Sequence, residues 1–135
     1  MSPSALAVVG YAAWMIVLLL VLAGLRVSLI LSGRRAPNSF RPDGSDVSPF
    51  AERLCRVHAN CYENLPIFAA LVLTALVTGN AAITDPLALW VLAARVGQSV
   101  VHLISTSALA VQVRFAFFVV QVVVEIWWVL ALLGR

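Results

Sequence analysis

The residues of this chain that could do chemistry are concentrated in one otherwise apolar segment near its middle. At about 100° of rotation per residue, a helix here places Arg56, Asn60 and Glu63 within about 60° of one another. Glu52 and Arg53 flank this face. A guanidinium, an amide and a carboxylate would then form a polar stripe along about three helical turns. Such a stripe can bind a charged, multidentate ligand through directed hydrogen bonds.

Three further apolar segments carry basic residues, which are Arg26 in the first, Arg95 and His102 in the third, and Arg114 at the start of the fourth. Arg95 and His102 are seven residues apart, so a helix holds them nearly in register. Among the charged residues of the four apolar segments, arginine outnumbers glutamate. A surplus of buried positive charge favours an anionic ligand, because the planar guanidinium fork matches a carboxylate. The alternative is that pairs such as Arg56 with Glu52 or Glu63, and Arg95 with Glu125, only hold helices together.

The elements that must position these residues are helices that cross a membrane. Of 135 residues, 62% are hydrophobic and 11% charged, whereas soluble chains have about 45–50% and about 25%. This excludes a water-soluble enzyme, a disordered chain and a nucleic-acid binder as leading classes. Because a spanning helix needs about 20 mostly apolar residues, we expect one all-α domain over residues 1–135, an up-down bundle of four transmembrane helices at about 5–31, 50–78, 85–108 and 114–133.

The arginines outside these spans predict the orientation in the membrane. The polar loop 32–49, rich in proline and glycine, carries Arg34, Arg35 and Arg41, and Arg114 lies near the third connection. The N-terminal tail and the second connection carry no arginine. By the positive-inside rule, the first and third connections are cytoplasmic and both termini are outside. We therefore expect a multi-pass integral membrane protein, which in a bacterium would lie in the inner membrane.

The segment from Glu52 to Pro66, ERLCRVHANCYENLP, resembles the E-R-x-x-R-x-x-x-N-x-x-E-x-x-P signature of the MAPEG family. These are membrane-associated proteins of eicosanoid and glutathione metabolism. The resemblance extends over the whole chain, which has four spans, a long polar first loop, an arginine in the third span and one before the fourth. It implies an up-down four-helix bundle that assembles as a homotrimer. It further implies that glutathione binds in a U shape between adjacent subunits, near the cytoplasmic side.

The resemblance also implies residue roles. Arg114 would be the catalytic residue that activates the thiol, and the glutathione-binding residues would be Arg26, Arg53, Arg56, Asn60, Glu63, Arg95 and His102. Arg53 would be structural or peripheral among them. Two positions depart from the family pattern, since His102 stands where several members have tyrosine and Ala59 where some have a second basic residue. Histidines and carboxylates show no metal-ligand spacing, so we expect no metal.

Three functions remain open at this stage. The first is a glutathione-dependent transferase or peroxidase acting on lipophilic electrophiles that arrive through the lipid bilayer; in a host with another low-molecular-weight thiol, that thiol would replace glutathione. The second is a non-catalytic member of the same fold, which the departures at His102 and Ala59 favour. The third is a small four-span transporter. Such a protein would need an acidic residue in the first span to couple proton movement to transport, but the only charged residue there is Arg26.

Overall fold

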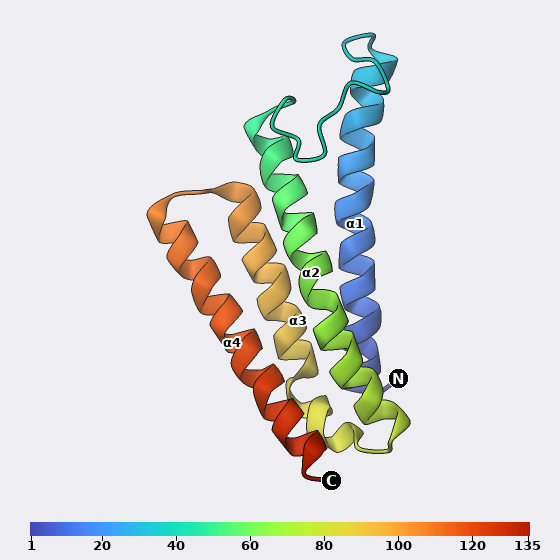
Figure 1. The fold of residues 1–135 in the computed structure, drawn as a ribbon, viewed down its shortest axis with the longest axis vertical. Coiled ribbons are helices and arrows are strands. Elements are labelled where there is room, and N and C mark those ends of the chain that lie inside the picture. The colour runs from blue at the N-terminus through green and yellow to red at the C-terminus, as the bar shows by residue number, and fades with distance from the viewer.

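The computed structural model describes all residues 1–135 and contains four helices and no strands. Each helix is long and apolar enough to cross a membrane. The helices run alternately up and down, so both termini lie at one end of the molecule and the long polar loop lies at the other (Figure 1). The expected all-α four-helix membrane bundle is therefore confirmed. Its helices are α1 (Pro3–Leu31), α2 (Pro49–Val77), α3 (Ala81–Ile104) and α4 (Ala108–Leu133).

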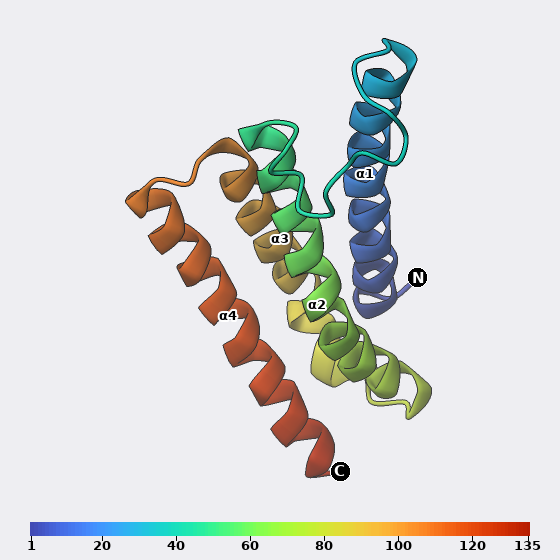
Figure 2. The same ribbon diagram turned by 45° about the horizontal axis from the view of Figure 1, so that its top comes forward.

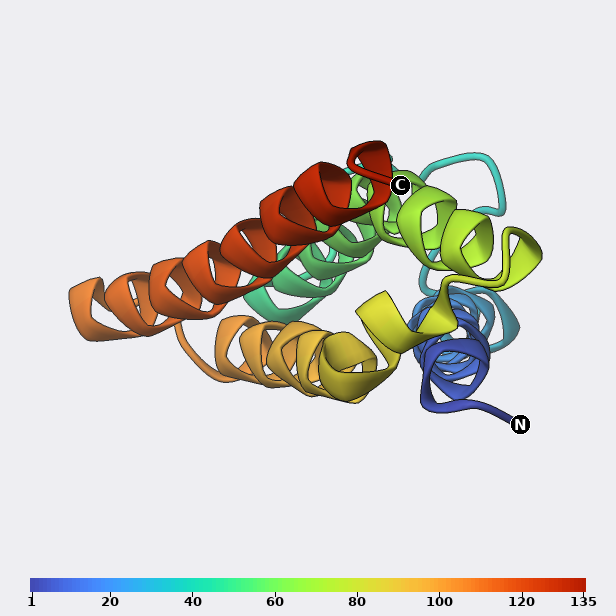
Figure 3. The ribbon, with the colours of Figure 1, turned by 90° about the horizontal axis from the view of Figure 1, so that it is seen from below.

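Helices α2 and α3 form the centre of the bundle. Helix α1 packs against both of them, whereas α4 packs mainly against α3 and makes no contact with α1. Figures 2 and 3 show α1 and α4 on opposite sides of the central pair. Aromatic side chains in the core connect three helices. The ring of Phe68 on α2 lies 5.4 Å from the ring of Tyr11 on α1 and 6.1 Å from that of Trp128 on α4. Helix α4 is thus held mainly by α3, with a smaller contact to α2.

Helix α3 begins at Ala81, four residues earlier than expected, so Thr84 and Asp85 lie inside its first turns. Asp85 instead accepts a hydrogen bond of 3.0 Å from the backbone N–H of Ser4, and the Ser4 and Thr84 hydroxyls are 2.7 Å apart. The first turn of a helix has N–H groups without intrahelical acceptors. Asp85 therefore serves the start of α1, and Asn80 stands at the N-cap of α3.

Helix α4 begins at Ala108, six residues earlier than expected, and α3 ends at Ile104 rather than near 108. Ser107 occupies the N-cap, and its side chain accepts a hydrogen bond from the backbone N–H of Ala110. Arg114 consequently lies about two turns into α4 and not just before it. Its side chain is half-buried.

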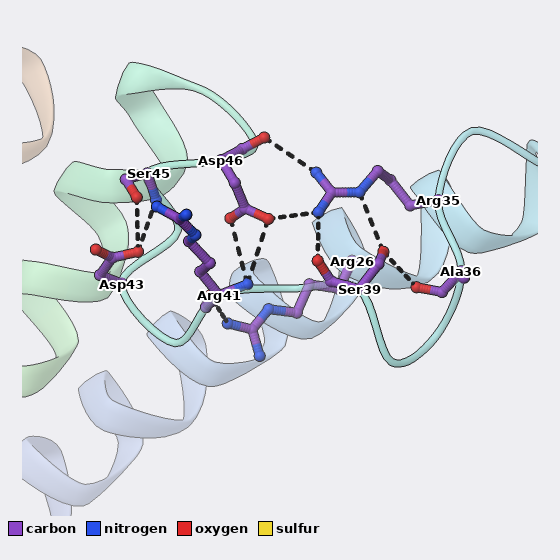
Figure 4. Close-up of polar contacts among 8 residues, drawn as sticks. All are labelled: Arg26, Arg35, Ala36, Ser39, Arg41, Asp43, Ser45 and Asp46. Atoms are coloured by element: carbon purple, nitrogen blue, oxygen red, sulfur yellow. Dashed lines mark hydrogen bonds and ion pairs between the residues drawn. The ribbon is translucent and has the colours of Figure 1, made fainter.

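The polar loop between α1 and α2 is held together by arginine contacts (Figure 4). Arg35 forms an ion pair with Asp46 and also donates to the Asp46 backbone oxygen at 3.0 Å. Arg26 donates to the backbone oxygen of Arg41 at 3.5 Å. The guanidinium carbons of Arg26 and Arg35 lie 5.7 and 4.9 Å from the centre of the Phe40 ring. Arg26 and Arg35 thus hold the loop against the end of α1 through Phe40, Arg41 and Asp46, and we call this set of contacts the loop clasp.

Acidification is expected to loosen this loop. The hydrogen bond from Arg35 holds the pKa of Asp46 below its usual value. Asp46 therefore stabilises the folded loop above its unfolded pKa, and this contribution is lost as the pH falls through the lower, folded pKa. Hydrogen exchange of residues 35–46, corrected for intrinsic rates, should become faster as the pH falls below the ordinary aspartate pKa of 3.8. The Asp46→Asn variant should exchange fast throughout, and pH-independent protection in the wild type would refute the clasp.

Candidate functional site

A pocket of about 330 Å³ lies between α2, α3 and α4, at the end of the bundle where α3 connects to α4. It brings together three of the residues expected from the sequence, namely Asn60 from α2, His102 from α3 and Arg114 from α4. Helix α3 adds the buried polar side chains of Gln98 and Ser99, and α4 adds the aromatic rings of Phe115 and Phe118. The remaining lining residues are Val57 and Val111.

Arg95 lies directly behind the pocket and only 2% of its surface is exposed. Its Nη1 donates a hydrogen bond of 2.5 Å to Oδ1 of Asn60, while its buried Nε has no partner. Because the Asn60 oxygen is occupied by Arg95, the amide nitrogen is left to donate to a ligand. Arg95 thus fixes the orientation of a pocket residue.

The pocket is electropositive. No carboxylate lines it, and Arg114 contributes a guanidinium to its wall. The Nε of Arg114 is buried and has no hydrogen-bond partner. An unpaired buried donor favours a ligand that can accept a hydrogen bond, above all an anion.

Two residues of the α2 stripe point away from this pocket. The Arg56 side chain is 64% exposed and pairs with Glu52 at 2.8 Å, and Glu63 is exposed without an ion pair. The sequence suggested two purely structural ion pairs. The pair of Arg56 with Glu52 forms within α2, whereas Arg95 and Glu125 form no ion pair between α3 and α4. The stripe is therefore divided between the interior of the bundle and its outer surface.

Arg26 and Arg53 also lie outside the pocket lining. Arg26 belongs to the loop clasp described above. Arg53 is half-buried, and its Nε donates a hydrogen bond of 2.9 Å to the backbone oxygen of Leu103 near the end of α3. Neither contact is with the interior of the pocket.

Ser99 of α3 contacts both α1 and α2. Its hydroxyl accepts from Nε1 of Trp14 at 3.2 Å, donates to the backbone oxygen of Arg95 at 2.9 Å and lies 3.3 Å from Sγ of Cys61. Helices α1, α2 and α3 thus meet behind the pocket. The aromatic lining residues Phe115 and Phe118 were missed, although Phe118 lies one turn after Arg114 and so on the same face of the helix.

Replacing Ser99 by alanine is expected to destabilise the bundle by about 1–3 kcal/mol, because the half-buried indole N–H of Trp14 loses its acceptor. Reversible unfolding of the detergent-solubilised protein measures this change. The matched control is Ser28→Ala, since the exposed Ser28 hydroxyl bonds only within its own helix. Equal effects of the two substitutions would show that the junction at Ser99 contributes nothing of its own.

Comparison with known proteins agrees with this architecture. No curated protein and no solved structure matches the chain. A family model does match, over residues 4–134, and it is that of the MAPEG family. The match spans all four helices, the polar loop and every residue of the pocket. The chain is therefore a multi-pass integral membrane protein that belongs to the MAPEG family, a family of glutathione and eicosanoid metabolism.

Proposed function

We propose that the chain is an integral membrane transferase or peroxidase that uses glutathione and acts on lipophilic electrophiles. The observation that carries this proposal is the composition of the pocket. Its charged and polar groups, Arg114, His102 and Asn60, share one cavity with the apolar side chains of Val111 and Phe115. A cavity with both kinds of wall suits a reaction between a charged thiol peptide and an apolar partner.

The residues present fit glutathione, which has two carboxylates, one ammonium group and a thiol. A volume of about 330 Å³ is within the range of roughly 300–1,000 Å³ found for ligand pockets. The unpartnered Nε of Arg114 and the free amide nitrogen of Asn60 are donors for carboxylate or peptide oxygens. Arg95 would add positive charge from behind.

Arg114 would hold the thiol in its deprotonated form, because a nearby guanidinium stabilises the thiolate and only the thiolate is a strong nucleophile. Bound glutathione supplies the sulfur that bonds to the electrophilic carbon, whose leaving group departs with its electron pair. Phe115 and Phe118 would hold the electrophile against the sulfur and keep water away from it. Val111 and Phe115 are exposed on α4, so an apolar substrate dissolved in lipid would reach the pocket directly.

We also propose that the active form is the homotrimer that the family resemblance implies. An ionised side chain in contact with lipid at mid-membrane costs at least about 2.5–3.5 kcal/mol. Arg56 and Glu63 are exposed on α2 of the single chain. A neighbouring subunit that covers this face would remove them from lipid and would bring them to a site shared between subunits. Native mass spectrometry in detergent tests the stoichiometry.

The pocket would face the cytoplasm. Figure 1 shows the connection between α3 and α4, beside which the pocket lies, at the same end of the bundle as the polar loop that carries Arg34, Arg35 and Arg41. Under the positive-inside rule this end is cytoplasmic and both termini are outside. Labelling of single cysteines introduced into the loop and at the C-terminus, in intact cells, tests this orientation.

A second candidate, a non-catalytic member of the fold, is favoured by one observation. His102 lines the pocket at the position where several family members have a tyrosine. A conjugation assay with glutathione and a chloronitrobenzene electrophile separates the two candidates. Turnover above the uncatalysed rate supports the enzyme, and saturable glutathione binding without turnover supports the second candidate. Absence of both would reject the enzyme.

A further inference from the structure

We infer that Arg53 is a positioning residue that ties the end of α3, and with it the His102 and Arg114 walls of the pocket, to α2. The observation is the hydrogen bond of 2.9 Å from its Nε to the backbone oxygen of Leu103. The inference rests on the proposed function, because it assigns Arg53 to building the proposed site and not to contact with glutathione.

The Arg53 bond supplies what the end of a helix lacks. The last four carbonyl groups of a helix have no intrahelical donor, and they carry partial negative charge that attracts a cation. Helix α3 ends at Ile104, so the Leu103 oxygen is one of these groups. The guanidinium of Arg53 is half-buried and lies 5.9 Å from the centre of the Phe50 ring. The bond is therefore charge-assisted and partly shielded from solvent.

The position of the C-terminal end of α3 determines where His102 and Arg114 line the pocket. His102 immediately precedes Leu103, so its imidazole moves with the last turn of α3. The connection to α4 has only residues 105–107, and Ser107 in that connection caps α4. Arg114 lies within the first turns of that helix. Because α4 packs mainly on α3 and does not touch α1, it has little else to hold its beginning.

Arg56 supplies an internal comparison on the same helix. It is one turn further along α2 than Arg53, but its side chain is 64% exposed and bonds only to Glu52 of its own helix. Removing the charge of Arg56 should leave the end of α3 where it is. The two arginines of one sequence motif therefore have different mechanical roles.

Hydrogen exchange of the detergent-solubilised protein, without glutathione, tests the tie. In Arg53→Gln, amides of residues 101–110 should exchange at least about 10-fold faster than in the wild type. Arg53→Lys should give a smaller increase in the same segment, because lysine keeps the charge but not the planar fork. Arg56→Gln should exchange there as the wild type does. Unchanged exchange in Arg53→Gln, or an equal increase in all four helices of both Arg53 variants, would overturn the inference.

Kinetics separate this role from the proposed function. In the conjugation assay, Arg53→Gln should lower kcat about 10-fold, and Arg53→Lys should recover most of the loss. A direct contact with glutathione would instead raise KM at an unchanged exchange rate of residues 101–110. If even the wild type does not conjugate glutathione, the proposed function fails, while the exchange measurement still decides whether Arg53 holds α3.

Discussion

Replacing Arg114 by leucine is expected to lower kcat/KM for conjugation by about 100- to 1,000-fold, the usual cost of removing one preorganised donor that stabilises developing or transferred negative charge. Arg114 is the only guanidinium that lines the pocket. Its buried Nε has no partner in the protein, so the substitution breaks no internal hydrogen bond of that nitrogen. The bundle should therefore remain folded while the thiolate loses its main counter-charge.

The ultraviolet absorbance of the thiolate and a single-turnover assay with a chloronitrobenzene electrophile measure this effect. Arg114→Lys should retain part of the activity, because it keeps the charge but loses the planar fork. Arg34→Leu is the matched control, since Arg34 is exposed in the polar loop and should have no effect. Full thiolate formation in Arg114→Leu would show that another group activates the thiol.

Replacing Arg95 by leucine is expected to weaken glutathione binding by about 10- to 100-fold with little change in stability. The substitution removes a buried charge whose Nε is unpartnered, and this recovers a desolvation cost. It also frees Oδ1 of Asn60, which loses its charge-assisted donor. Such bonds contribute about 1.5–3 kcal/mol, so the two effects on folding largely offset each other. The ligand, however, loses both the oriented Asn60 amide and the positive charge behind it.

Calorimetric titration of glutathione into Arg95→Leu, Asn60→Ala and the double variant measures this coupling. If Arg95 acts through Asn60, the double variant should bind no more weakly than the weaker single variant. A loss in the double variant equal to the sum of the two single losses would contradict the account, because it would mean that the two residues contact the ligand independently. Unfolding of the same three proteins checks that stability is nearly unchanged.

The four helices were predictable because each contains a long apolar stretch that has no stable position other than across a membrane. The starts of α3 and α4 were not, because each helix begins before the polar residues that are most conspicuous in the sequence. Thr84-Asp85-Pro86 has the composition of a cap, but Asp85 bonds to Ser4 on another helix. Ser107 caps α4, although the more conspicuous polar residue in that region is Arg114.

The candidate site was predictable only as far as single helices define it. Angular spacing correctly placed Asn60 in a polar stripe, yet it does not determine which edge of the stripe faces the other helices. That depends on the rotation of α2 against α3, which brings Asn60 to Arg95 and leaves Arg56 outside. The contact of Arg53 with Leu103 joins residues 50 positions apart and involves a backbone oxygen. No pattern of side-chain types reports such a contact.

The central claim is that this pocket binds glutathione and holds it as a thiolate. Titration of glutathione into the purified wild-type protein in detergent, followed by both calorimetry and ultraviolet absorbance, tests the claim directly. We predict saturable heat of binding and a thiolate absorbance that rises in parallel with it near neutral pH. Neither heat nor thiolate absorbance at any glutathione concentration would contradict the account.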